Sequence, residues 1–158
     1  MLVVITIISI IISGVVLSVG VVGRDTSLIT ETRRLSDLLE YVRDRAELES
    51  RDYGLKINRT GYEFLRYEPR TSLWVIPEDE SLRPRKLPTG LLIELDLEGR
   101  TMVLASTKKE TILHPQLGVQ ANGDYTPFEL RMRREGNSIT EIIRPNEEGG
   151  LTTSESEK

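Results

Sequence analysis

The spacing of apolar positions changes twice along this chain and divides it into three parts. Residues 2–23 contain no charged side chain. A helix over this run, at about 1.5 Å per residue, would be roughly 33 Å long, which is enough to cross a hydrocarbon core of about 30 Å. The pattern therefore predicts that residues 1–23 form a membrane-spanning helix.

A cleaved secretory signal is the alternative for this run. Such signals have an apolar core of about 7–15 residues that ends at a small-residue cleavage site. The run here is longer than that, and Ser18–Val19–Gly20 is a weak match to a cleavage site. The pattern favours an anchor that stays in the membrane.

From residue 24 to residue 50 the apolar positions recur with helical spacing. They form one stripe, and the opposite face of the same helix is charged. No proline separates this segment from the apolar run, so we expect one helix from Leu2 to about Glu49, with its first half in lipid and its second half on a folded domain. The stripe that would pack on that domain consists of Leu28, Leu35, Leu39, Val42 and Ala46.

After Ser50 the period changes from that of a helix to that of strands. Alternating residues on both sides of the turn at 59–61 predict a hairpin, and further short strands are expected at 73–76, 91–97, 102–105, 117–119, 128–133 and 138–143. Consecutive strands without crossover helices pair antiparallel. The predicted fold class is therefore α+β, with a long N-terminal helix packed on antiparallel sheets and a β-rich head at 51–144. The aromatic residues Tyr62, Phe64, Trp74 and Phe128 are expected in its core.

The last segment, 145–158, consists mostly of Gly, Ser, Thr and Glu. Leu151 is its only aliphatic residue. Such a composition offers little apolar surface to bury, and it predicts a disordered acidic tail.

The sequence offers no pattern that indicates catalysis or a bound metal or cofactor. There is no phosphate-binding loop, dinucleotide fingerprint, nucleophile elbow or zinc-protease motif. The absence of cysteine excludes disulfides and thiol chemistry, and the one histidine, His114, has no second histidine beside which to bind a metal. A net charge of −4 does not favour nucleic-acid binding. We therefore expect no enzyme activity, no cofactor and no nucleic-acid partner.

A charged, proline-containing loop at 78–88 carries the strongest local cluster of basic residues. Its basic members are Arg83, Arg85 and Lys86, and they are candidates for contacts with a phosphate, a lipid headgroup or a protein partner. The acidic residues at 78–80 weaken that attraction, so a solvated loop is the favoured interpretation.

Several motifs together resemble a known family. The run Leu2–Ile10 resembles the mature N-terminus of type IV pilin-like proteins. The later motifs resemble the minor pseudopilin H of type II secretion systems, namely 50–55 (SRDYGL), 61–64 (GYEF), 82–88 (LRPRKLP), Pro115–Gln116 and 123–128 (GDYTPF). The resemblance covers about residues 2–145.

The resemblance implies a pilin-like fold and a structural function. Such a subunit lies at or near the tip of a periplasmic pseudopilus and helps to export folded proteins. The implied partners are other minor pseudopilins, the major pseudopilin and the inner membrane, with an exported protein or the outer-membrane secretin as further candidates. The implied location is the inner membrane, crossed once, with the C-terminal domain in the periplasm. The residues expected to anchor and pack the first half of the helix are Leu2, Val3, Ile5, Ile8, Ile12, Gly14, Ser18 and Gly20.

One departure from the family pattern concerns position 1. Family members carry a short basic leader and then Phe-Thr-Leu-Ile-Glu ahead of the apolar run, and the leader is cleaved and the new N-terminus methylated. Met1 aligns immediately after that glutamate. We expect in-frame codons for Gly-Phe-Thr-Leu-Ile-Glu upstream of Met1.

Two alternatives remain open at the level of sequence. One is a minor type IV pilin for adhesion, motility or DNA uptake. DNA uptake would favour a basic C-terminal region, whereas the last twelve residues hold four Glu and one Lys. A mobility-shift assay at low salt would separate these functions. The other alternative is a membrane-anchored enzyme, for which the sequence provides no catalytic residues.

Overall fold

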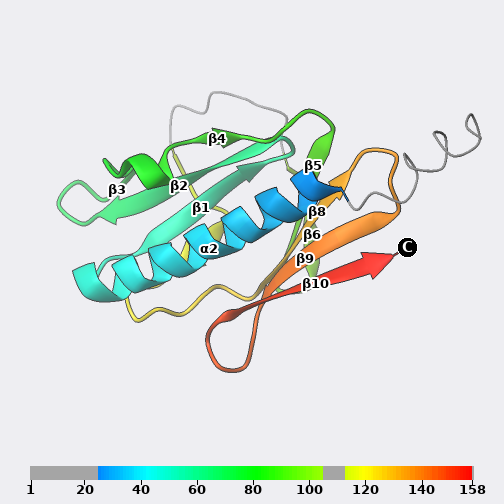
Figure 1. The fold of residues 1–158 in the computed structure, drawn as a ribbon. Helices are drawn as coiled ribbons and strands as arrows, with labels where there is room; N and C mark the ends of the chain where they lie inside the picture. The colour runs from blue at the N-terminus through cyan, green and yellow to red at the C-terminus, as the bar shows by residue number, and fades with distance from the viewer. Residues whose placement is uncertain (1–24, 105–112, 158) are drawn as a thin grey trace, which may run out of the picture.

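The computed structural model describes residues 25–104 and 113–157, and in these residues one helix lies along two antiparallel sheets (Figure 1). This arrangement confirms the predicted fold class. The expected membrane helix at 1–23 lies outside the described residues. Within the described residues, no helix combines the length and the hydropathy needed to cross a bilayer.

Helix α2 (Thr26–Glu49) begins and ends at defined caps. The Asp25 Oδ1 atom accepts a hydrogen bond from the backbone N–H of Leu28 at 3.1 Å, which satisfies one of the free amides of the first turn. At the other end Ser50 adopts a left-handed conformation with φ of 49°, and its N–H returns to the helix carbonyls. The helix therefore ends where the sequence period changes.

The first sheet contains the predicted hairpin. Its strands are β1 (Tyr53–Asn58), β2 (Gly61–Glu68), β3 (Leu73–Val75), β4 (Arg85–Lys86) and β7 (Leu117–Val119). Their order is β3-β2-β1-β7, with β4 pairing with the start of β2. A short 3-10 helix, η1 (Glu80–Leu82), precedes β4. The segment at 78–88 is therefore not a plain solvated loop, because β4 joins it to the sheet.

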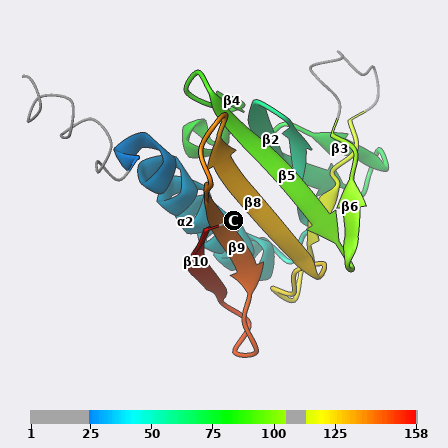
Figure 2. The ribbon, with the colours of Figure 1, turned by 90° about the vertical axis from the view of Figure 1, so that its right-hand side faces the viewer.

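The second sheet follows the order β10-β9-β8-β5-β6, and Figure 2 shows it with β10 at one side and β6 at the other. Its strands are β5 (Leu91–Leu97), β6 (Arg100–Met102), β8 (Phe128–Arg134), β9 (Ile139–Pro145) and β10 (Leu151–Glu157). The strand expected at 102–105 lies slightly earlier, at β6, where it pairs with β5 across a tight turn.

The expectation of a disordered tail is wrong for residues 151–157. Strand β10 pairs antiparallel with β9 along its full length, from Leu151 opposite Pro145 to Glu157 opposite Ile139. Leu151 also packs against the core. The polar composition fits the position at the edge of a sheet, where hydrogen bonds to one neighbouring strand order the backbone and charged side chains face water.

The core lies between α2 and the inner faces of the two sheets. Tyr62, Phe64 and Phe128 are buried there, as the sequence predicts. Trp74 is only half-buried, because it lies on the short edge strand β3, where its ring packs against Tyr67 with 5.4 Å between centroids. Inward-facing aliphatic residues of both sheets complete the core, among them Leu55, Ile57, Leu91, Ile93, Leu95, Leu130, Met132 and Ile143.

Candidate functional site

The helix stripe forms the main junction between α2 and the head. Its five members, Leu28, Leu35, Leu39, Val42 and Ala46, are each at most 1 % exposed. The helix contacts strands of both sheets, so the stripe closes the space between them. Burial of one leucine contributes about 1.5–3 kcal/mol, so apolar packing is the largest force that holds α2 to the head.

A polar cluster holds the N-terminal end of α2. Arg134, at the end of β8, pairs with the Asp25 carboxylate, and its Nη2 atom also donates to the Ser27 hydroxyl at 2.6 Å. Its Nη1 atom donates to the Thr89 carbonyl at 3.0 Å. The hydrogen bonds from Arg134 hold the pKa of Asp25 far below its usual range. The point where the helix emerges from the head is therefore tied to both β8 and the loop before β5.

Arg131, Arg133 and Arg134 lie close together along β8, and the structure gives them different partners. Arg131 pairs with Asp96, and Arg133 pairs with Glu94 at 3.0 Å; both partners lie on the neighbouring strand β5. Arg134 alone reaches α2. Its partner Asp25 is 109 positions away in the sequence, so no local pattern identifies the contact.

A second ion pair ties the N-terminal half of the helix to β4. Glu31 is 5 % exposed, and Arg85 binds both of its carboxylate oxygens, with Nε to Oε2 at 2.9 Å and Nη2 to Oε1 at 2.7 Å. These hydrogen bonds lower the pKa of Glu31 despite its burial. Of the three basic residues considered for partner contacts, Arg85 is therefore engaged within the subunit, whereas Arg83 and Lys86 are exposed.

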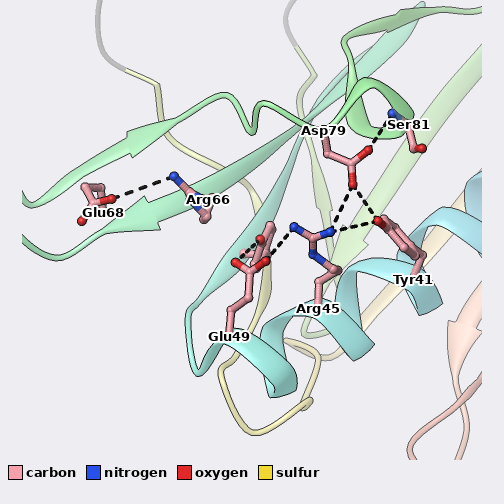
Figure 3. A network of polar contacts seen from close by, with 8 residues as sticks. Tyr41, Arg45, Glu49, Arg66, Glu68, Asp79 and Ser81 are labelled. Atoms are coloured by element: carbon pink, nitrogen blue, oxygen red, sulfur yellow. Dashed lines mark hydrogen bonds and ion pairs between the residues drawn. The ribbon is translucent and has the colours of Figure 1, made fainter.

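A third cluster joins the C-terminal half of α2 to the segment before η1 (Figure 3). The Tyr41 hydroxyl donates to Asp79 Oδ2 at 2.6 Å, and Arg45 donates to the Tyr41 oxygen at 3.1 Å and pairs with Glu49 at 2.7 Å. The Tyr53 hydroxyl donates to Glu49 Oε2 at 2.7 Å. The hydrogen bond from Tyr41 is the largest cause of a lowered pKa at Asp79.

These clusters position the helix. Each of the carboxylates at positions 25, 31, 49 and 79 is bound to a cation or a hydroxyl from the protein itself. No group of three or more metal-binding side chains converges anywhere in the described ranges. His114 is exposed in the segment before β7. The arrangement is that of a joint that holds α2 rigidly on two sheets.

The same carboxylates predict that the joint weakens in acid. The pKa values of Asp25 and Asp79 lie below their ordinary value of 3.8, and that of Glu31 lies below 4.5. At a pH between the folded and unfolded pKa values, the folded protein binds fewer protons than the unfolded protein. The three carboxylates therefore contribute fully to stability above about pH 5, and this contribution is lost as the pH falls through their lowered pKa values. We expect the urea midpoint of the full chain to fall between pH 5 and pH 3. Glu31→Gln should make the fall shallower, and a constant midpoint from pH 7 to pH 3 would contradict this assignment.

The anchor residues expected from the sequence, from Leu2 to Gly20, lie outside the described residues. The stripe, by contrast, lies at the joint. Sequence reasoning missed Asp25, Glu31, Tyr41, Arg45, Asp79 and Arg134 as parts of that joint. The one local signal available was the Asp25-x-Ser27 start of the helix, which is typical of an N-cap.

Comparisons with known proteins agree with this geometry. No family model matches the chain. It is 34% identical over 141 residues to type II secretion system protein H of Pseudomonas aeruginosa, with 86% of this chain and 80% of that protein covered. It is 24% identical over 148 residues to the protein of the same name from Aeromonas hydrophila, covering 88% and 81% of the two chains.

The fold is similar to that of the minor pseudopilin EpsH from the type II secretion system of Vibrio cholerae. The TM-score is 0.68 at 21% identity, over 84% of this chain and 96% of that structure. The identity and coverage shared with the Pseudomonas protein, together with a helix seated on two antiparallel sheets, show that this chain belongs to the type II secretion system protein H family of minor pseudopilins.

Proposed function

We propose that this chain is a structural subunit at or near the tip of the periplasmic pseudopilus that drives protein export. The observation that carries the proposal is the joint itself. The buried stripe and three polar clusters hold α2 on the head, so that a force on the N-terminal part of the helix is transmitted to the whole head. A fibre subunit needs this property, whereas an enzyme on a flexible tether does not.

The proposal assigns the apolar run at 2–23 two successive environments. Before assembly it crosses the inner membrane once, with the head in the periplasm. In the fibre it packs among the helices of neighbouring pseudopilins, where Gly14, Ser18 and Gly20 permit close approach. Other minor pseudopilins and the major pseudopilin are the proposed partners, with an exported protein or the secretin as further contacts at the tip.

The test is complementation at the native locus, so that any upstream codons are retained. Deletion of the gene is expected to trap exported proteins in the periplasm, and the unchanged gene should restore their release. Ile8→Asp should fail to restore it, because a carboxylate within a membrane helix costs up to about 3 kcal/mol on insertion scales. Ile8→Leu is the matched control and should restore release.

The same strains distinguish the minor type IV pilin alternative. Loss of secretion with normal twitching and DNA uptake would support the proposal. Normal secretion with loss of either pilus function would overturn it. Fractionation should find the chain in the inner membrane, and a chain that stays in the soluble periplasmic fraction would also contradict the proposed anchor.

A further inference from the structure

The charges on the exposed face of α2 are unevenly distributed along the helix. The N-terminal half carries Arg33, Arg34 and Asp37, and the C-terminal half carries Glu40, Asp44 and Glu47, all of them exposed. The half-buried Arg43 and Arg45 of the C-terminal half pair with Asp44 and Glu49. Because a surface ion pair contributes at most about 1 kcal/mol, charges on this face have little to do with the stability of the head. Their uneven distribution suggests a surface that meets another charged surface.

Two adjoining hollows border the cationic half. One of about 350 Å³ lies along the helix and is lined by Ile29, Arg33 and Leu38 among others. The second, of about 250 Å³, lies between the helix and the segment from η1 to β4, where Arg83 lines it. Both are lined by Arg34 and Leu38, so they adjoin at these two side chains, and we consider them together. We call this pair of hollows the α2 groove and define it by Ile29, Arg33, Arg34, Leu38 and Arg83.

The cations of the α2 groove lack strong partners within the described part of the chain. Arg33 and Arg83 form no ion pair there. Arg34 lies 3.9 Å from Glu31 Oε1, but Arg85 already binds that oxygen at 2.7 Å. Asp37 and Glu80 border the groove without pairing with any of the three arginines. In a protein with a net charge of −4, this is a locally basic groove with half-buried aliphatic residues, Ile29 and Leu38, beneath it.

We propose that the α2 groove receives the acidic flank of a helix from a different pseudopilin in the same fibre. Its aliphatic side chains would cover Ile29 and Leu38, and its carboxylates would pair with Arg33, Arg34 and Arg83. This inference rests on the proposed function and names the chemistry of the neighbouring subunit. The acidic half of this chain's own α2 is an example of the required surface.

Staggered parallel helices would bring such surfaces together. From the Arg33–Arg34 pair to the middle of the acidic residues Glu40, Asp44 and Glu47 is about ten residues along α2, or about 15 Å. Consider a neighbouring subunit that also carries its acidic residues in the C-terminal half of its helix. If that helix is shifted by this distance toward the N-terminal end of α2, its acidic residues lie beside the α2 groove. A phospholipid headgroup is less suited to the groove, which has an aliphatic floor and runs away from the predicted membrane end, from Ile29 to Leu38.

The test uses a photoreactive amino acid in the full chain, expressed in its host with the complete secretion machinery. One probe replaces Leu38, and a second replaces the exposed Thr30 in the same hollow in case the first disturbs folding. A third probe at Ile8, in the apolar run, reports assembly of the fibre independently of the groove. Adducts are mapped by mass spectrometry.

The expected adduct joins a groove probe to a helix of another pseudopilin. The cross-linked residue of that partner should lie within one helical turn of an Asp or Glu. Arg33→Glu combined with Arg83→Glu should lower the yield of this adduct about tenfold or more, because attraction at two positions becomes repulsion. Arg59→Glu combined with Arg70→Glu is the matched control: both arginines are exposed and lie outside the groove, so the yield should not change.

The other outcomes are decisive as well. Pseudopilin adducts from Ile8 but none from the groove would overturn this inference and leave the proposed function standing. Adducts from the groove probes only to phospholipid, or only to a second copy of this chain, would also overturn the inference. It would be overturned as well if both double variants lowered the yield of the pseudopilin adduct equally. No pseudopilin adduct from any probe would overturn both proposals.

Discussion

Leu39→Ala is expected to lower the free energy of unfolding by about 3–5 kcal/mol. The Leu39 side chain is completely buried in the middle of the stripe. The backbone carbonyl of Leu39 accepts a hydrogen bond from the Tyr125 hydroxyl at 3.1 Å. Truncation removes apolar contacts and leaves a cavity between the helix and the sheets, which cannot close because strands on both sides are held in their ladders. The expected loss is therefore at the high end for a leucine.

The measurement is urea unfolding of the full chain in detergent micelles, followed through Trp74, the single tryptophan. Leu48→Ala is the control, since Leu48 is on the same helix and is 83 % exposed. Its effect should stay within about 0.5 kcal/mol. If both variants lost the same free energy of unfolding, the stripe would not be what holds α2 on the head. The proposal that the helix transmits force to the head would then lack support.

The helix and most strands could be predicted because their signals are local. A stripe at 28, 35, 39, 42 and 46 repeats with the helical period, and it coincides with the buried positions of α2. The strands β5 and β8 alternate with period two and bury their inner residues accordingly. Local periodicity is sufficient wherever an element has one buried face.

The remaining features depend on contacts between distant residues. Strand β10 is ordered by its ladder with β9, and its own composition resembles a disordered tail. Arg85 appeared to be free for a partner, yet Glu31, 54 positions earlier, binds it. The polar joint around Asp25, Asp79 and Arg134 likewise joins residues whose proximity exists only once both sheets are folded. Sequence periodicity contains no information on which strands become neighbours.

The motifs that resemble the family have a physical explanation in the fold, because two of them contact each other. Gly54, in the motif at 50–55, lies in β1, an inner strand of the first sheet, opposite Leu65 and Gly118. Pro115, from the later Pro-Gln pair, covers it. The next residue, Gln116, binds the backbone of Ile57 twice, accepting from its N–H at 2.8 Å and donating to its carbonyl at 3.2 Å. The glycine and the Pro-Gln pair therefore serve one packing contact.

Gly54→Ala is accordingly expected to lower the free energy of unfolding by about 3 kcal/mol, the upper end for overpacking. A Cβ atom at position 54 would lie 2.4 Å from Pro115 Cβ and 2.6 Å from its Cγ. The proline ring cannot rotate away, so the backbone leading to β7 must move and Gln116 must release Ile57. Faster hydrogen exchange at the Ile57 amide should accompany the loss of stability, and it distinguishes this local displacement from a general loss of packing.

Gly150→Ala is the control for the loss of glycine itself. Its Cβ would approach only the side-chain amide of Asn146, at 3.3 Å from Nδ2, so the cost should stay below about 1 kcal/mol. A Gly54→Ala protein with unchanged stability and an equally protected Ile57 amide would mean that Pro115 does not press on β1. The shared motif would then need an explanation outside the subunit, in a contact with a neighbouring pseudopilin.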